Sequence, residues 1–317
     1  MHTHTLHSSH ARTAAPWSLC SASAWRWGAA ADQAAQRAQI GFAGFQCSVL
    51  CGSLILWSQV VLTDSAGAKA DVYLFGGVCT SWVPAGGKDV LFVRPDAVFN
   101  KSKPISGGIP HCFPQFGPGA MQLHGFALNL DWALTSTTGG AAPSVELTLV
   151  DTAATREMWP TAFKATQTIT LASGKLTATL TVTNTDAKPF SFTSSFHTYF
   201  AVSDLSAVAV EGLQGLKMLD RMAQPAVEGT AAGAVNIKGP VDSVYYKAPA
   251  QLMLKTGGGK AVAIKAGGWP DAVVWNPWTA MEACYKDFVC VENAAVGQPI
   301  TVTPGASWSG SMELTAH

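Results

Sequence analysis

The sequence predicts a large, antiparallel, mostly-β sandwich, and three observations lead to this prediction. From about residue 59, short runs rich in Val, Thr, Leu, Phe and Tyr are separated by Gly, Pro, Asn or Asp, which is the pattern of strands joined by turns. Apolar and polar residues alternate over Lys175–Thr183, so one face of that strand should be buried and the other wet. Outside the Ala-rich first segment, no long stretch repeats apolar residues at helical spacing.

The expected strands follow one another with short connections. In chain order they are Val60–Thr63, Val72–Phe75, Val90–Val93, Val145–Val150, Thr166–Leu171, Lys175–Thr183, Ala261–Lys265 and Asp287–Val291. Residues 172–174 read as a three-residue hairpin loop, with Gly174 at the position that tolerates positive φ. The 317 residues include 30 Gly and are 48% hydrophobic, which supplies turns and core for one domain over residues 59–317.

Two segments rich in proline and aromatic residues are expected not to be strands. Lys103–Pro118 contains four prolines, and a proline cannot donate to a sheet ladder. Trp269–Trp278 is similar, because Trp275–Trp278 reads as a turn that carries large side chains. Both segments are expected to line a pocket. An aromatic floor with a few polar groups is suited to sugars, whose C–H faces stack on rings while the hydroxyls need donors and acceptors.

Charge and cysteine usage exclude several classes of function. The chain has 20 basic and 20 acidic residues and no basic cluster, so nucleic acid is not an expected partner. The seven cysteines are an odd number without repeated spacing. Cys47 and Cys51 lie four apart, but no second pair completes a zinc site. We expect free thiols and therefore a reducing compartment.

Residues 1–58 differ in composition and are interpreted as a mostly disordered leader. They contain Arg12, Arg26 and Arg37 but only one acid, Asp32, and are rich in Ala, Ser and His, which is typical of an organelle transit peptide. We expect import into an organelle, a chloroplast in the first place, with the cytoplasm as the alternative. The apolar run over Val49–Trp57 is too short to span a bilayer, which takes roughly 20 residues, so no membrane span is expected.

Histidine is used sparingly in the body of the chain. Only His111, His124 and His197 lie between residues 11 and 316, each within a run of Gly, Pro or aromatic residues. Asp271 and Glu292 follow downstream amid apolar residues. One histidine that donates a proton, another that holds a ligand, and a desolvated acid would together form a proton-shuttling pocket.

Five motifs in order identify a family resemblance. GGIPHCFPQFGP, HGFALN, FHTYF, VVWNPW and CVENAAV together resemble the glucose-6-phosphate 1-epimerase branch of the aldose 1-epimerase, or galactose mutarotase-like, family. The similarity covers roughly Val60 to Leu314. It implies the galactose mutarotase-like supersandwich and an isomerase that needs neither metal nor nucleotide cofactor.

The resemblance also implies which residues carry the chemistry. His197 matches the position of the family's general acid, and Glu292 matches that of its general base. Interconversion of α and β anomers needs both, because the C1 hydroxyl loses a proton while the ring oxygen gains one. Taken alone, His197 could be a core histidine bonded to backbone, and Glu292 could be a surface ion-pair residue at a strand end.

Further ligands are implied around this pair. His124 matches a sugar-hydroxyl or ring-oxygen ligand, with a hydrogen-bonded turn residue as the alternative. Asp271 matches a hydroxyl-binding aspartate, with a turn or helix cap after Pro270 as the alternative. Gln115 is expected to face the pocket, and His111 to be a packing residue.

The chain departs from the family pattern at the expected phosphate clamp. Hexose-6-phosphate members carry Arg before GGIP and after HGFA, where this chain has Ser106 and Leu128. Neither side chain supplies the charged fork that suits phosphate. Ser106 remains a candidate substrate-binding residue. The nearby cations that could substitute for the missing arginines are Arg94, Lys101 and Lys103, and of these we expect Arg94 and Lys103 to bind substrate.

The sequence therefore predicts a monomeric hexose-6-phosphate mutarotase that acts on glucose 6-phosphate. Two alternatives stay open because of the altered clamp: a mutarotase for non-phosphorylated aldoses, and a non-catalytic carbohydrate-binding or structural subunit of a plastid complex. In each case the expected ligand is a hexose or hexose phosphate.

Overall fold

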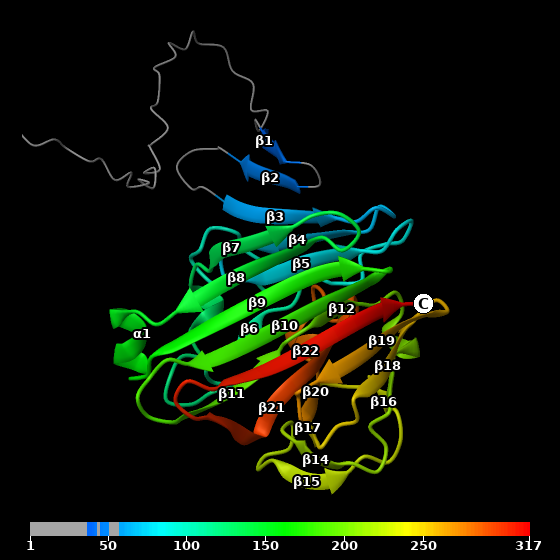
Figure 1. Cartoon of the computed structure of the whole chain (residues 1–317). Coiled ribbons are helices and arrows are strands. Elements are labelled where there is room, and N and C mark those ends of the chain that lie inside the picture. Colours follow the sequence, from blue (N-terminus) through cyan, green and yellow to red (C-terminus); the bar gives the residue numbers. More distant parts are fainter. Residues whose placement is uncertain (1–36, 43–44, 51–56) are drawn as a thin grey trace, which may run out of the picture. The chain divides into compact units, whose positions relative to one another are not determined.

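Strands form most of the regular structure (Figure 1). The computed structural model describes residues 37–42, 45–50 and 57–317, with side chains from residue 58. Within these residues the only α-helix is the six-residue α1 (Ala153–Met158), and the other helical turns are η1 (Ala127–Asn129), η2 (Leu205–Ala207) and η3 (Trp278–Met281). The predicted β class is confirmed.

Three antiparallel sheets account for the strands. A five-stranded sheet runs in sequence order: β1 (Arg37–Phe42), β2 (Phe45–Leu50), β3 (Trp57–Thr63), β4 (Lys69–Tyr73) and β5 (Val78–Val83). A nine-stranded sheet has the order β16 (Val235–Asn236), β13 (Ala209–Glu211), β18 (Gln251–Gly257), β19 (Lys260–Gly267), β22 (Ser307–Ala316), β10 (Lys175–Asn184), β9 (Phe163–Ala172), β8 (Ser144–Val150) and β7 (Ala133–Thr138).

The eight-stranded sheet carries the site described below. Its order is β15 (Val227–Thr230), β14 (Lys217–Asp220), β17 (Val241–Tyr246), β20 (Asp271–Asn276), β21 (Phe288–Val302), β11 (Phe190–Phe196) and β6 (His111–Cys112), with β12 (Tyr199–Ala201) also paired to β21. The long strand β21 therefore lies in the interior of this sheet, between β20 on one side and β11 and β12 on the other.

The core lies between the two larger sheets, because each presents one apolar face. In β10 buried and half-exposed residues alternate without interruption, as the sequence predicts, and Leu176 and Leu180 are fully buried. They join one core cluster with Phe196 of β11 and Val291 of β21. Full burial of each such side chain stabilises the fold by about 1.5–3 kcal/mol.

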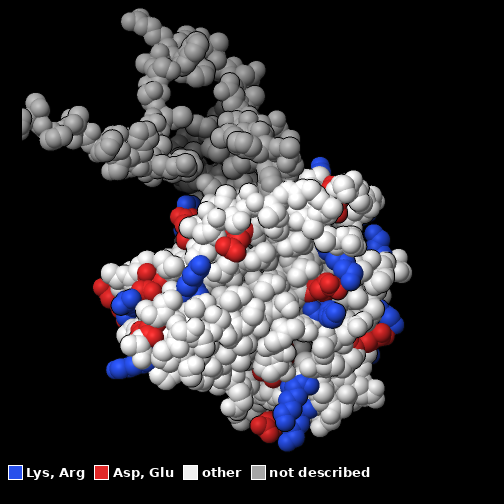
Figure 2. All heavy atoms as spheres, viewed as in Figure 1, with Lys and Arg blue, Asp and Glu red and all other residues white. Residues whose placement is uncertain are grey.

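The outer face of the nine-stranded sheet is polar, and its charged residues include the ion pair of Lys175 and Glu313 at 2.8 Å. Thr177, Thr179 and Thr181 of β10 are half-buried there, and Ser309 of β22 shares a hydroxyl hydrogen bond with Thr181 at 3.0 Å. Figure 2 shows this face with its charged side chains mainly towards the margins. The Thr-rich alternation that marks these strands in the sequence is thus the solvent face of the sandwich.

The structure corrects three local predictions. The β9–β10 hairpin has a two-residue loop, because Ala172 pairs with Lys175 and both Ser173 and Gly174 have positive φ. The expected strand Val90–Val93 forms only isolated bridges. The segment Trp269–Trp278, expected not to be a strand, contains β20 (Asp271–Asn276), since its two prolines lie just outside the strand and leave the ladder intact.

The amino-terminal expectations lie mostly outside the described residues. Of the predicted leader, residues 1–36, 43–44 and 51–56 lie outside the described residues. Within the segment predicted to be mostly disordered, however, β1 and β2 are strands, paired with each other and, through β2, with β3. No helix among the described residues is long and apolar enough to cross a membrane. The described thiols Cys79, Cys112, Cys284 and Cys290 are free.

Candidate active site

One register across the eight-stranded sheet brings the predicted acid and base together. Ser195 pairs with Ala294, and Tyr199 pairs with Cys290, across the same pair of antiparallel segments. Continuing this register between the two pairs places His197 opposite Glu292. Because side chains alternate along a strand, these residues share the face that points away from the core.

The two side chains are in contact. His197 Nε2 lies 3.5 Å from Glu292 Oε1. The other carboxyl oxygen, Oε2, accepts a hydrogen bond of 2.6 Å from Ser195 Oγ. Glu292 is 1% exposed, and burial raises its pKa to about 8 although the Ser195 hydroxyl and the Arg221 charge oppose that shift. At neutral pH the unliganded site therefore holds Glu292 mainly as the neutral acid.

His197 is held by aromatic neighbours. Its ring stacks on Tyr199 with centroids 5.1 Å apart, and it meets the Trp275 ring in a T-shaped arrangement with centroids 5.5 Å apart. Burial, followed by the electrostatic effects of the neighbouring His124 and Arg221, lowers the pKa of His197 to about 3. Its Nδ1 is buried and has no hydrogen-bond partner among the described residues. The contact with Glu292 is therefore the polar contact that governs proton exchange at this ring.

His124 is fixed as a hydrogen-bond donor to the cavity. Its Nδ1 accepts the Gly117 N–H at 3.2 Å and lies 3.1 Å from Cys112 Sγ. An accepting Nδ1 places the ring hydrogen on Nε2. Burial lowers the pKa of His124 to about 4, so the ring is neutral. The backbone of His124 has positive φ. At the next position, a β-carbon on Gly125 would lie 2.3 Å from the Phe113 carbonyl oxygen, which explains why a glycine follows His124.

A cavity of about 790 Å³ opens above these groups. This volume suits a small-molecule ligand. The predicted residues that line it are His124, His197, Glu292, Ser106, Arg94 and Lys103. Its walls include the Lys103–Pro118 segment, as the sequence predicts, and Trp275 and Met281 add apolar surface.

Two charged residues in the cavity wall were missed by the sequence reasoning. Arg221 Nε donates to Asp242 Oδ1 at 2.9 Å, and its guanidinium lies 5.0 Å from the Phe116 ring centroid. Asp242 pairs with Trp275, which in turn pairs with Cys290. Strand pairing thus places Asp242, Trp275 and Cys290 in one row across the neighbouring strands β17, β20 and β21. No local sequence motif encodes this relation.

Two predicted sugar ligands do not line the cavity. The Asp271 carboxylate accepts the backbone N–H groups of Val296, Gly297 and Lys247 at 2.8–3.3 Å. It therefore stabilises an irregularity in β21, which agrees with the alternative role of a backbone cap. Gln115 bonds the backbone of Gly117, Met121 and Gln122, so that it shapes the loop. His111 is buried and bonds Gly77 O at 2.9 Å, as expected for packing.

The fold and geometry define an acid–base site for a small polar ligand on the face of a β-sandwich. The family model of aldose 1-epimerase matches residues 58–315. The chain belongs to this family, and it is an isomerase of the epimerase type.

Similarity to individual proteins agrees with this membership. A protein of Cenchrus ciliaris is 38% identical over 277 residues, which are 81% of this chain and 84% of the relative. One of Escherichia coli K12 is 31% identical over 260 residues, covering 77% and 86%. Both are named, provisionally, glucose-6-phosphate 1-epimerase. A crystal structure of a provisionally named mutarotase from Salmonella typhimurium superposes with a TM-score of 0.80 at 26% identity, covering 89% of this chain and 96% of that one.

Proposed function

We propose that this protein is a hexose-6-phosphate mutarotase that interconverts the α and β anomers of glucose 6-phosphate. The observation that carries the proposal is the 3.5 Å contact between His197 Nε2 and Glu292 Oε1 at a cavity lined by three cations. The names of the Cenchrus and Escherichia relatives support the same substrate.

The reaction needs one group that accepts a proton and one that donates a proton. In the predicted roles, the Glu292 carboxylate removes the proton of the C1 hydroxyl while the His197 imidazolium protonates the ring oxygen. The bond between C1 and the ring oxygen breaks, and C1 becomes an aldehyde carbon. Rotation about C1–C2 presents the other carbonyl face, and the same groups reverse the transfers as the ring closes. Acid–base assistance of this kind contributes about 10² to 10⁴-fold.

The pair has to share a single proton for these roles. In the unliganded site the raised pKa of Glu292 and the lowered pKa of His197 place that proton on the carboxyl group. Transfer across their contact yields the carboxylate and imidazolium without a net change in charge. Bound sugar hydroxyls would stabilise the charged form, since donors next to a carboxylate lower its pKa.

Cations in the cavity wall support a phosphorylated substrate. Arg94 and Lys103 line the cavity together with Ser106, where the family pattern has arginine. Arg94 is bidentate to Asp96, with bonds of 2.9 and 2.7 Å, whereas Lys103 forms no ion pair within the described residues. We infer that Lys103 and Arg94 replace the arginines that Ser106 and Leu128 lack.

The proposal is tested by magnetisation-exchange NMR between the anomers of glucose 6-phosphate, with and without the protein. Acceleration that is larger for glucose 6-phosphate than for free glucose or galactose supports it. A preference for the free sugars would instead indicate a mutarotase for non-phosphorylated aldoses. An exchange rate equal to that of buffer for all three sugars would contradict a catalytic role.

We also propose that the protein works as a monomer in an organelle, with the chloroplast expected first. The Arg- and Ser-containing, acid-poor segment over residues 1–58 supports import. Size-exclusion chromatography and the location of a carboxy-terminal fluorescent fusion test the two expectations.

A further inference from the structure

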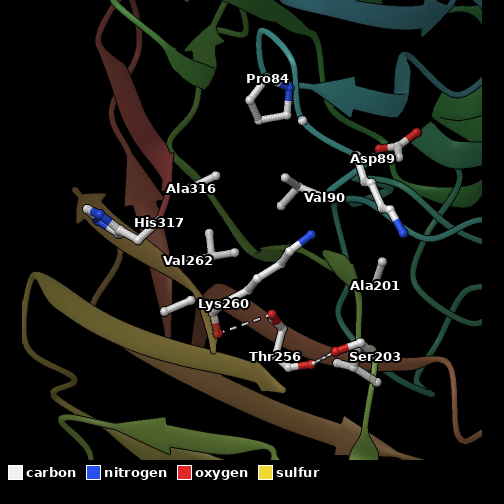
Figure 3. A pocket seen from close by; sticks show the side chains of 14 residues that line it. Pro84, Asp89, Val90, Ala201, Ser203, Thr256, Lys260, Val262, Ala316 and His317 are labelled. Carbon is white, nitrogen blue, oxygen red and sulfur yellow. Dashed lines mark hydrogen bonds between the residues drawn. The ribbon is translucent and has the colours of Figure 1, made fainter. Parts of the chain in front are cut away.

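A second cavity, of about 350 Å³, lies away from the catalytic residues (Figure 3). None of the residues that line it also lines the catalytic cavity. Its walls come from the segment after β5, from β12 and the residues that follow it, from the β18–β19 hairpin, and from the end of β22. The apolar part of the wall consists of Pro84, Val90, Ala201, Val202, Ala261, Val262 and Ala316.

Two ammonium groups accompany this apolar wall. Lys88 and Lys260 both line the cavity, and Figure 3 shows the Lys260 side chain extending across the hollow from β19. Within the described residues neither lysine forms an ion pair. Both lysines are exposed, and their ammonium groups beside this apolar wall favour an anionic ligand by electrostatic attraction.

The acidic groups nearby are bound to the protein's own chain. Asp89 also lines the cavity, but its Oδ1 accepts the N–H groups of Trp82 and Leu91 at 3.0 Å, and its Oδ2 accepts Ser81 Oγ. The main chain of the terminal residue, His317, is paired with Ala261 in both directions. These bonds hold the Asp89 carboxylate and the last residue at the edge of the sheet.

Hydroxyl groups complete the polar part of the wall. Ser203 Oγ donates to the Thr256 carbonyl at 3.2 Å, and Thr256 Oγ1 donates to the Lys260 carbonyl at 3.4 Å. Each hydroxyl oxygen therefore keeps lone pairs that can accept from a ligand. The β18–β19 hairpin packs closely against Ser203. A β-carbon at Gly257 would lie 3.0 Å from Ser203 Oγ, and Gly257 has positive φ.

We propose that this cavity is a second small-molecule site, for a compact hydroxylated organic anion such as a three-carbon phosphomonoester or hydroxycarboxylate. Lys88 and Lys260 bind the anionic group, Ser203 and Thr256 accept from its hydroxyls, and the valine and alanine side chains contact its carbon skeleton. This inference is independent of the proposed reaction, because it uses no residue of the catalytic cavity.

The test is titration of the full chain with glycerol 2-phosphate, followed residue by residue through amide NMR shifts, with glycerol as the uncharged control. Saturable shifts at Ser203, Thr256 and Lys260 are expected with glycerol 2-phosphate and not with glycerol. Lys260→Ala should weaken the affinity about tenfold, because it removes a charged hydrogen-bond donor. Lys265→Ala, an exposed lysine on the same strand that does not line the cavity, is the matched control and should leave the affinity unchanged.

A second variant keeps the test independent of charge. Ala316→Leu should fill part of the cavity and reduce binding while the anomer exchange rate and thermal unfolding stay at the wild-type values. Shifts confined to residues of the catalytic cavity would overturn the proposal. So would unchanged affinity in both Lys260→Ala and Ala316→Leu, or binding equally weakened by Lys265→Ala.

Discussion

The floor and the wall of the catalytic cavity are built in different ways. The floor consists of side chains on paired segments, with His197 opposite Glu292 because one antiparallel register runs through both. The wall that carries Arg94, Lys103 and His124 is largely irregular backbone with prolines and positive-φ residues. The sheet ladder therefore positions the proposed proton-exchanging pair, whereas loops place the groups that we propose recognise the substrate.

The largest effect is expected from breaking the floor. Glu292→Gln keeps the size of the side chain but removes the group that exchanges the proton, so the anomer exchange rate should fall about 10² to 10⁴-fold. The rate is measured by exchange NMR at saturating glucose 6-phosphate. Glu313→Gln, which changes a carboxylate on β22, is the matched control and should retain full activity. A loss below about threefold in Glu292→Gln would contradict the proposed role.

Breaking the wall should affect substrate preference instead. Lys103→Ala should raise KM for glucose 6-phosphate about tenfold, since charged hydrogen bonds contribute about 1.5–3 kcal/mol. The rate with free glucose should stay the same, because its ring has no phosphate. Lys101→Ala is the control: Lys101 bonds Asp131 at 2.7 Å and does not line the cavity. Equal changes for both sugars would show that Lys103 acts on the fold and not on phosphate.

Two aspartates distinguish structural support from ligand contact. Asp271→Asn should lower the free energy of unfolding by about 1 kcal/mol, because the carboxylate accepts three backbone N–H groups, while KM changes little. Asp242→Asn should instead raise KM. Urea unfolding and steady-state kinetics on both variants measure this. A raised KM with unaltered stability in Asp271→Asn would restore Asp271 as a sugar ligand.

The last expected effect is the pH dependence of stability that the buried acid causes. The pKa of Glu292 is about 8 in the folded protein, against 4.5 for an unperturbed glutamate, so the folded state binds more protons between these values. The raised pKa of Glu292 therefore makes its full contribution to the free energy of unfolding below about pH 4.5, and this contribution is lost as the pH rises through 8. Relative to wild type, Glu292→Gln should gain stability from pH 5 to pH 9. Urea unfolding at several pH values measures this difference, and a constant difference would contradict the raised pKa.

The sequence predicts much of the floor but less of the wall. Alternation over Lys175–Thr183 predicts a strand with one buried face, and β10 confirms it. The five motifs point to His197 and Glu292, and both lie at the cavity. Asp242 and Arg221 could not be found in this way, because they reach the site through strand pairing between residues far apart in the chain.

Asp271 shows the limit of reading a motif without its partners. It lies close to VVWNPW in the sequence and on the same sheet face as Glu292, but its carboxylate faces N–H groups released where β11 and β21 lose register. Local sequence cannot reveal this irregularity, because it arises from a mismatch in length between two strands. The position of a carboxylate on the correct face is therefore not sufficient to make it a ligand.

That mismatch has a consequence for how the chain tolerates changes in length. Between the pairs Ser194–Ala295 and Phe192–Ile300, one residue of β11 faces four of β21. An insertion or deletion after Ala295 can be accommodated in these unpaired residues of β21. It would not alter the strand pairing on the amino-terminal side of Ala295. A single residue added between Cys290 and Glu292 would instead rotate the carboxylate into the core. Insertions, deletions and loop exchanges should therefore be tolerated on the carboxy-terminal side of Ala295. On its amino-terminal side they should abolish turnover.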